Sequence, residues 1–336
     1  MHIPDYYTET PLEYRAVRET VGIADLSDEG ALLVAGADRT DFLQNLISND
    51  IHLATEHQGI FATALTAKGK VIAAFNLYRL PDAYLLTMES SLTEKTREHL
   101  MRFKFRSKIE ITAPPWGKFL VAGPHAKNLV EQLLQRKLPA MTAQSFFYQE
   151  ADPTFCVRQT QTGEEEYHLY CDEKNKDDMG ASLIALGVPL GAEWIGQAAL
   201  DVIYLEAGLP RYGIDLSEEI LPNEAGLEAS AISYTKGCYP GQEVIARIKT
   251  YGHINKHRVG LILEGDQTAL SGEKIFSGDQ EIGRVLASNH SPFLKKPIAT
   301  AFLRSAFAKE GEKVTVPIEG LNTLATVTPL PFYQRG

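Results

Sequence analysis

The stretch LLVAGADRTDFLQNLI, Leu32 to Ile47, decides the fold, because FLVAGPHAKNLVEQLL, Phe119 to Leu134, aligns with it without gaps. Leucine, valine, alanine and glycine recur in the same order, and so does a leucine near the end of the stretch. Each copy predicts a strand, a glycine and then a helix, because the spacing of its apolar residues changes at the glycine. One short match can also arise by chance, but the simpler interpretation is a duplicated unit.

A strand pair and a further helix are expected after each copy of this unit. In the first half, GIFATALTAKGKVIAAFNLYRL predicts a hairpin that turns at Lys68-Gly69. A helix is expected from Thr10 to Val21, because Thr10 and Glu13 have capping-box spacing. Another is expected from Ala192 to Leu205, with Gly208 as its stop. These patterns predict an α+β protein in which two related units share a cleft.

The pattern of apolar and polar residues changes beyond Lys256. Short alternating segments such as RVGLILEG, EIGRVLAS and PIATAFL are separated by glycine and proline. They predict a small β-barrel. We therefore expect a first domain over residues 1–250, made of units at about 1–115 and 116–250, and a C-terminal barrel over residues 256–332.

Composition narrows the class of protein. The chain has 336 residues, 44% of them hydrophobic and 23% charged, which is typical of soluble proteins with cores of their own. No apolar run approaches the roughly 18 residues of a membrane span, and MHIPDYYTET lacks the pattern of a signal peptide. We expect a cytoplasmic protein without a membrane partner.

The balance of charge argues against one class of partner. The net charge of −10 disfavours direct binding of duplex nucleic acid by the surface as a whole, although a local basic pocket stays open. The acidic run Glu164-Glu165-Glu166 is interpreted as a solvated hairpin edge.

Motifs for metals and nucleotide phosphates are weak or absent. Neither GxGxxG nor GxxxxGK[ST] occurs, and the three cysteines form no CxxC pair. His253 and His257 are four residues apart, but no HExxH glutamate accompanies them, so solvent-facing histidines are favoured and no metal site is assigned. Cys156 and Cys171 lie in strand-like segments and are interpreted as core or edge residues.

Cys238 is different because it lies in KGCYPGQE, Lys236 to Glu243. Pro240 suits the first turn of a helix, so the thiol is expected just before a helix N-terminus, where backbone N–H groups favour a thiolate. Lys236 adds a second positive charge. From spacing alone, a reactive thiol and a buried apolar plug are equally supported.

KGCYPGQE also resembles the signature of the YgfZ family of folate-binding proteins, and the passages LEAGLPRYGIDL and LPNEAGLE resemble that family and its relative, the glycine-cleavage T-protein. The N-terminal segment is similar as well, so the resemblance covers nearly the whole chain. It implies a T-protein-like fold with tetrahydrofolate, or a one-carbon derivative of it, in a central cavity. It also implies support of iron–sulfur proteins, including cluster enzymes that modify tRNA.

The resemblance also implies roles for single residues. Glu206 in LEAG matches the carboxylate that receives the N–H donors of the pterin; its alternative is a surface carboxylate in the last helical turn. Phe61 matches an aromatic position beside the folate and could equally be plain core. Gln242 falls where T-proteins have a basic residue, and Tyr212 follows the LEAG loop. Lys236 and Cys238 are the candidate catalytic residues.

One departure separates the branches of this superfamily. T-proteins have paired aspartates after the hairpin turn, where this chain has Ala73 and Ala74, and Tyr204 replaces an arginine that precedes LEAG. A methyl group cannot exchange a proton, so aminomethyl transfer by that mechanism is expected to be lost. A folate-binding accessory factor is therefore favoured over a folate-dependent one-carbon transferase and over an interaction scaffold.

Overall fold

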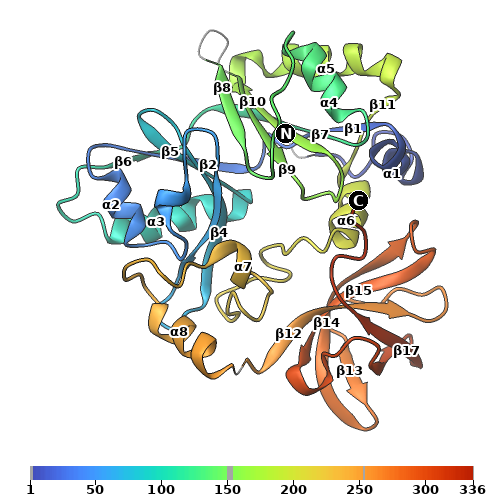
Figure 1. The fold of residues 1–336 in the computed structure, drawn as a ribbon. Coiled ribbons are helices and arrows are strands. Elements are labelled where there is room, and N and C mark those ends of the chain that lie inside the picture. Colours follow the sequence, from blue (N-terminus) through green and yellow to red (C-terminus); the bar gives the residue numbers. More distant parts are fainter. Residues whose placement is uncertain (1–2, 150–153, 253, 336) are drawn as a thin grey trace.

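The computed structural model describes residues 3–149, 154–252 and 254–335, and these form two sheets with helices and a separate barrel (Figure 1). The first sheet has the order β3-β4-β5-β2-β6. Its strands are β2 (Gly30–Ala35), β3 (Ile60–Leu65), β4 (Val71–Arg79), β5 (Ala83–Met88) and β6 (Glu110–Thr112). The second sheet has the order β11-β1-β7-β10-β9-β8. Its strands are β1 (Val21–Asp25), β7 (Trp116–Ala122), β8 (Phe146–Gln149), β9 (Thr154–Gln159), β10 (Glu166–Asp172) and β11 (Ala192–Trp194).

The duplication expected from the sequence is present in the fold. The first copy forms β2 and α2 (Arg39–Gln44), and the second forms β7 and α4 (Ala126–Leu133). The glycine between strand and helix has a positive φ in both copies, 109° at Gly36 and 130° at Gly123. A Cβ atom on either glycine would lie within 3 Å of a backbone oxygen, so glycine is required at both positions. Each copy is followed by an antiparallel hairpin and a third strand that pairs with the first.

The two units are not consecutive halves of the chain. β1 pairs with β7 and β11 in the second sheet, although it precedes every strand of the first sheet. In the second sheet β1 lies beside β7, where the first sheet has β6 beside β2. The N-terminal strand of the expected first unit, residues 1–115, therefore belongs to the second sheet. The domain boundaries stay a prediction.

Outside the barrel, the described residues form six further helices. They are α1 (Thr10–Glu19), α3 (Thr93–Arg102), α5 (Lys176–Gly187), α6 (Gln197–Glu206), α7 (Glu228–Ala231) and α8 (Gln242–Tyr251). Short 3₁₀ turns lie at 51–53, 90–92, 173–175, 188–190 and 305–307. The helix expected from Ala192 was wrong at its start, because residues 192–194 pair with β1 as strand β11.

The start of α1 also differs from the expected capping box. Glu13 is fully buried and accepts hydrogen bonds from the backbone of Tyr7 and Thr8 at 2.6 and 2.7 Å. It also accepts one from Gly196 N at 2.8 Å, which ties α1 to the start of α6. Glu13 therefore joins separate segments rather than capping its own helix.

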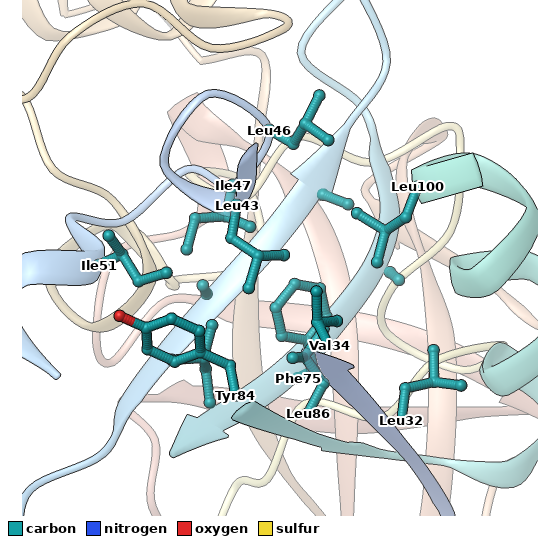
Figure 2. Close-up of a cluster of buried hydrophobic side chains, with 14 of the residues drawn as sticks. Leu32, Val34, Leu43, Leu46, Ile47, Ile51, Phe75, Tyr84, Leu86 and Leu100 are labelled. Carbon is teal, nitrogen blue, oxygen red and sulfur yellow. The ribbon is translucent and has the colours of Figure 1, made fainter. Parts of the chain in front are cut away.

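Each sheet has a core of its own. In the first unit α2, α3 and the sheet enclose an apolar cluster, with Phe75 of β4 among the leucine, isoleucine and valine side chains (Figure 2). A second cluster lies between the other sheet and helices α4 and α5. The apolar residues of the repeated stretch are consecutive in its strand, where residues 117–122 of β7 are all buried, and they follow helical spacing afterwards, where one face of the helix packs on the sheet.

The barrel predicted beyond Lys256 is confirmed. Six strands close in the order β12-β15-β14-β13-β16-β17 around an apolar core. Their bounds are β12 (Lys256–Leu263), β13 (Lys274–Ser277), β14 (Gln280–Ser291), β15 (Lys296–Arg304), β16 (Lys313–Ile318) and β17 (Leu321–Thr328). After β17 the chain returns to the second unit, where Tyr333 N donates to Glu206 O and Arg335 N donates to Gly163 O, both at 2.9 Å.

The acidic run 164–166 is not a solvated edge, so that expectation was wrong. Glu164 is 3% exposed and Glu166 is fully buried. Glu164 pairs with Arg18 at 3.4 Å and with Arg335 at 3.0 Å. Glu166 accepts hydrogen bonds from Thr162, and its Oε1 lies 2.7 Å from Nε2 of a buried histidine on β10. Partners far away in the sequence permit the burial of Glu164, and neighbours two and four residues away do so for Glu166.

Candidate functional site

A cavity of about 490 Å³ lies where the two units meet the segment 209–230. Strand β4 and the end of β5 form its wall on the first unit, while β7 and β9 contribute from the second. Its volume falls within the range of about 300 to 1,000 Å³ that is usual for small-molecule sites. The cavity is therefore the candidate binding site.

Two of the six residues proposed from the sequence line this cavity, Phe61 and Tyr212. Phe61 is half-buried on β3 opposite Asn76 of β4, which also lines the cavity. The backbone oxygen of Phe61 accepts a hydrogen bond from Asn49 Nδ2 at 2.9 Å. The ring packs against an apolar cluster as well, so Phe61 is at once part of a core and part of the cavity wall.

Tyr212 is fixed from both ends. Its backbone N–H donates to Glu89 Oε1 at 2.8 Å, and its hydroxyl accepts from Lys95 Nζ at 2.6 Å. The Lys95 ammonium also lies 4.9 Å from the centre of the Tyr212 ring and pairs with Glu218 at 2.6 Å. These contacts hold the 209–216 segment against the first unit.

Glu89 is a cavity residue that sequence reasoning missed. It directly follows β5 and lines the cavity. Burial raises the pKa of the Glu89 carboxyl, although the N–H of Tyr212 and the charge of Arg211 act in the opposite direction. Its second oxygen, Oε2, has no hydrogen-bond partner among the described residues. A half-buried carboxyl with a free oxygen can accept N–H donors of a ligand or carry a proton. Its position directly after an apolar strand was the available signal.

The two alanines on β4 point to opposite sides, as successive strand residues do. Ala73 is fully buried in the core opposite Ala64, while Ala74 lines the cavity. Tyr204 of α6 lines the cavity as well, and burial raises the pKa of its hydroxyl. At Ala74, strand β4 thus presents a methyl group to the cavity and no titratable group.

A charge pair marks the cavity wall on the second unit. Lys118 of β7 is 5% exposed, and its Nζ pairs with the carboxylate of Glu29. Both residues line the cavity. The Lys118 ammonium also lies 5.6 Å from the centre of the Tyr170 ring. No sequence signal connected Lys118 with Glu29, because they belong to different units and meet only in the folded chain.

Glu206 does not line the cavity, contrary to the expectation from LEAG. It is fully buried in the last turn of α6. Its Oε2 accepts from Tyr14 and from Arg18, both at 2.7 Å. Its Oε1 accepts from Ser291 Oγ at 2.5 Å and from Phe293 N at 3.4 Å. Both carboxylate oxygens are therefore occupied by α1 and the barrel, and the structure gives Glu206 an architectural role.

The Lys236 side chain points toward the first unit. The expectation was that its positive charge would support the thiolate of Cys238. Its ammonium donates to three backbone oxygens that follow or end α2, those of Gln44, Ile47 and Asn49, the last two at 2.6 and 3.2 Å. Burial lowers the pKa of Lys236 to about 8. The ammonium also lies 5.0 Å from the ring of Tyr239. Lys236 therefore anchors its loop, and its charge is committed to carbonyl groups.

Cys238 is exposed, and it does not line the cavity. The helix after it begins at Gln242, later than Pro240, because Gly241 takes a left-handed φ of 82° and becomes the N-cap. A Cβ on Gly241 would lie 2.6 Å from Thr66 O, so this glycine is required for the contact with the β3–β4 turn. Contacts of Lys236 and Gly241 thus hold the loop on both sides of Cys238, whose thiol is exposed to solvent.

Gln242 lies outside the cavity as well. Its Nε2 donates to Lys236 O at 3.4 Å, across the base of the Cys238 loop. Further along α8, Arg247 pairs with Glu243 at 2.7 Å, as expected for an ordinary ion pair on a helix.

The other two thiols are buried, as their strand-like surroundings predicted: Cys156 is fully buried and Cys171 is 2% exposed. Among the described residues there is no group of three or more histidine, cysteine, aspartate or glutamate side chains that could hold a metal ion. His253, one of the two histidines weighed for a metal, lies outside these residues. No helix in the described part of the chain is long and apolar enough to cross a membrane.

The fold places two related α+β units beside a C-terminal barrel, and the candidate cavity is lined by the two units and the segment 209–230. Residues 1–236 match the GCVT N-terminal domain family, and residues 256–334 match the glycine cleavage T-protein C-terminal barrel domain. The chain therefore belongs to the glycine-cleavage T-protein family.

Individual relatives cover almost the whole chain. An aminomethyltransferase of Caldanaerobacter subterraneus subsp. tengcongensis is 28% identical over 96% of this chain and 87% of its own length. One from a Geobacillus strain is 28% identical over 99% of this chain and 93% of its own length. In fold, the chain is similar to the glycine cleavage system aminomethyltransferase T of Bartonella henselae, with a TM-score of 0.91 and 22% identity over 98% of this chain and 91% of the other.

Proposed function

We propose that this protein is a folate-binding accessory factor of the YgfZ type. It binds tetrahydrofolate, or a one-carbon derivative of it, in the central cavity and supports iron–sulfur proteins, including cluster enzymes that modify tRNA. Cys238 is its functional thiol. Membership of the T-protein family and the KGCYPGQE signature support this proposal.

The residues of the cavity fit the proposed ligand. A pterin has N–H donors and a flat ring system, and the cavity wall offers a carboxylate oxygen without a partner on Glu89 and the aromatic side chains of Phe61 and Tyr212. Glu89 would accept the N–H donors in charge-assisted hydrogen bonds, and Phe61 would contact the ring. In this proposal Glu89 replaces Glu206 as the carboxylate that recognises the pterin. When bound, tetrahydrofolate supplies nitrogen atoms that can carry a one-carbon unit.

The position of Ala74 is the observation that carries the proposal. This residue lines the cavity on β4, at the second of the two positions where T-proteins have paired aspartates. A methyl group there can neither accept a proton nor stabilise positive charge that develops on a nitrogen. The cavity thus keeps the features of a binding site and lacks the acid of the transfer reaction.

Binding at this cavity is tested by calorimetric titration with tetrahydrofolate. Phe61→Ala and Glu89→Gln should each weaken binding about ten-fold or more, whereas Glu243→Gln on the exposed face of α8 should leave it unchanged. Equal affinity in all four proteins would place the folate elsewhere.

The iron–sulfur role is tested by rescue of a loss-of-function strain. Cys238→Ala should fail to restore the activity of a cluster-dependent enzyme that the wild type restores, while Cys156→Ala should restore it if the variant folds. Full rescue by Cys238→Ala would remove the thiol from the proposed function. In this proposal the Cys238 thiol serves as a nucleophile, a transient ligand or a redox group.

Glu89 supports a second candidate, a one-carbon transferase that takes its acid from the residue after β5 instead of from β4. Burial raises the pKa of the Glu89 carboxyl, which favours its protonated form and suits a group that can donate a proton. Formation of methylene-tetrahydrofolate from an aminomethyl donor, abolished in Glu89→Gln, would establish this candidate over the accessory factor.

A further inference from the structure

Residues 101–108, MRFKFRSK, form an exposed surface that belongs neither to the cavity nor to the Cys238 loop. They end α3 and lead into β6, and we call them the 101–108 tip. Figure 1 shows α3 and β6 in the first unit, on the side of the molecule away from the barrel. Charged and apolar side chains alternate along the tip.

The apolar side chains of the tip are unusually exposed. Phe105 is 90% exposed, and Met101 and Phe103 are 40% and 39% exposed. Phe105 also has a φ of 35°, in the left-handed region that bulky residues rarely adopt. The chain therefore presents an aromatic ring to solvent at a turn whose backbone is strained.

Four cations surround these side chains: Arg102, Lys104, Arg106 and Lys108. Within the described residues, none of the four has a carboxylate within ion-pair distance. A chain with a net charge of −10 thus concentrates four unpaired positive charges in eight residues. Such a cluster is complementary to a flexible polyanion that touches the tip alone.

We propose that the 101–108 tip binds single-stranded nucleic acid, with phosphates on its cations and a base stacked on Phe105. Aromatic side chains interleaved with Lys and Arg are the elements of single-strand binding, because every base has a face to stack and every nucleotide a phosphate. A duplex hides those faces, and a short turn cannot fill a groove as a helix does. This inference is independent of the folate cavity.

A membrane surface fits the same residues less well. An anionic bilayer is an extended surface that would also face the acidic remainder of the molecule, whereas a single strand can contact the tip alone. The tip also lacks the continuous apolar face of an interfacial helix, because only Phe105 is almost fully exposed.

The test is fluorescence anisotropy with a labelled oligouridylate of about 16 nucleotides, the upper end of single-site lengths. The wild type should bind in the micromolar range at low salt. The affinity should fall as salt rises, with a log–log slope of roughly −2 to −3 for three or four phosphates. Phe105→Ala should weaken binding about ten-fold, and Lys104→Glu/Arg106→Glu should abolish it.

A matched control comes from the barrel, where Lys295 and Lys296 are also exposed. Lys295→Glu/Lys296→Glu changes the charge by the same amount as the tip variant and should change the affinity less than three-fold. Competition with poly-glutamate, a polyanion without bases, should displace the oligonucleotide only at large excess.

Four outcomes would overturn the proposal. These are no binding at low salt, equal affinity in Phe105→Ala, equal loss in the barrel control, and equally effective competition by poly-glutamate. Sedimentation with vesicles that contain phosphatidylserine, lost in Phe105→Ala, would assign the tip to a membrane if the oligonucleotide does not bind. Circular dichroism of each variant separates loss of binding from loss of fold.

Discussion

Lys236 fixes the Cys238 loop to the first unit through three carbonyl groups. The segment KGCYPGQE therefore combines an anchor, Lys236, with the exposed residue that the anchor holds in place, Cys238. This division of roles explains why a lysine is placed near the thiol without needing its charge to act on the sulfur.

Lys236→Met should lower the free energy of unfolding by about 2 to 4 kcal/mol, because it leaves buried carbonyl groups without a donor. Lys68→Met, at an exposed lysine on the β3–β4 turn, should change it by no more than about 0.5 kcal/mol. Urea denaturation of both variants measures the difference. If the two substitutions cost the same, Lys236 does not anchor the loop.

Iodoacetamide should alkylate Cys238 in the native protein long before Cys156 or Cys171, because only Cys238 is exposed. Burial also raises the pKa of the Cys156 thiol, which further slows its reaction. Peptide mass spectrometry after timed quenching gives the three rates, and a urea-unfolded sample gives the reference. Similar native rates at all three cysteines would disagree with the fold described here.

At the scale of elements, local sequence patterns were enough to predict the strands and turns. They were not enough to predict where helices end or which residues are buried. The duplicated strand, glycine and helix, the hairpin at Lys68-Gly69 and the barrel depend on spacing and on glycine conformations that short segments encode. By contrast, β11 was taken for part of α6, because its three residues become a strand only through pairing with β1.

Long-range partners also explain which parts of the site were missed. LEAG placed Glu206 near a ligand, but the direction of its carboxylate is set by Arg18 and Ser291. The burial of Glu164 was not foreseen because its partners lie in α1 and at the C-terminal end of the chain, whereas the partners of Glu166, Thr162 and His168, are close in the sequence. Phe61 and Tyr212 line the cavity, and their contact with a folate stays a prediction, whereas Glu89 was not foreseen.

Strand β10 carries a pH-sensitive pair, His168 with Glu166. Burial lowers the pKa of His168, and the charge of Lys118 adds to this effect. The unfolded chain therefore binds a proton that the folded chain does not, in the window from the ordinary histidine pKa of 6.5 down to the lowered pKa of the folded state. Stability should be present above that window and should fall as pH falls through it.

Urea midpoints between neutral and mildly acidic pH measure this loss, and His168→Asn should flatten the pH dependence even if it lowers stability at every pH. His99→Asn is the comparison, because burial lowers the pKa of His99 as well, but no carboxylate of the described residues forms an ion pair with it. An unchanged slope in His168→Asn would show that this pair does not titrate on unfolding.

At the scale of the whole molecule, a buried charge network joins the barrel to the units. Glu206 connects α6 with Arg18 of α1 and with Ser291 of β14. Arg18 also contacts Glu164, and its guanidinium lies 3.8 Å from the ring of Tyr333, which follows the barrel. The network therefore connects α1, α6, the barrel and the C-terminal segment.

Glu206→Gln should lower the free energy of unfolding by about 2 to 4 kcal/mol, because Arg18 stays buried with only part of its counter-charge. Tetrahydrofolate affinity of the folded variant should stay within two- to three-fold of the wild type, because Glu206 lies outside the cavity. Thermal unfolding and calorimetric titration separate the two effects. Lost affinity in a fully folded variant would return Glu206 to the binding site.

The central claim is that the cavity binds folate without the acid needed for aminomethyl transfer. The most direct measurement incubates the protein with tetrahydrofolate and an aminomethyl donor and follows bound folate, methylene-tetrahydrofolate and released ammonia in the same sample. We predict one bound folate per chain and no more product than in a protein-free control. Absence of bound folate, or product formation above that control, would contradict the claim.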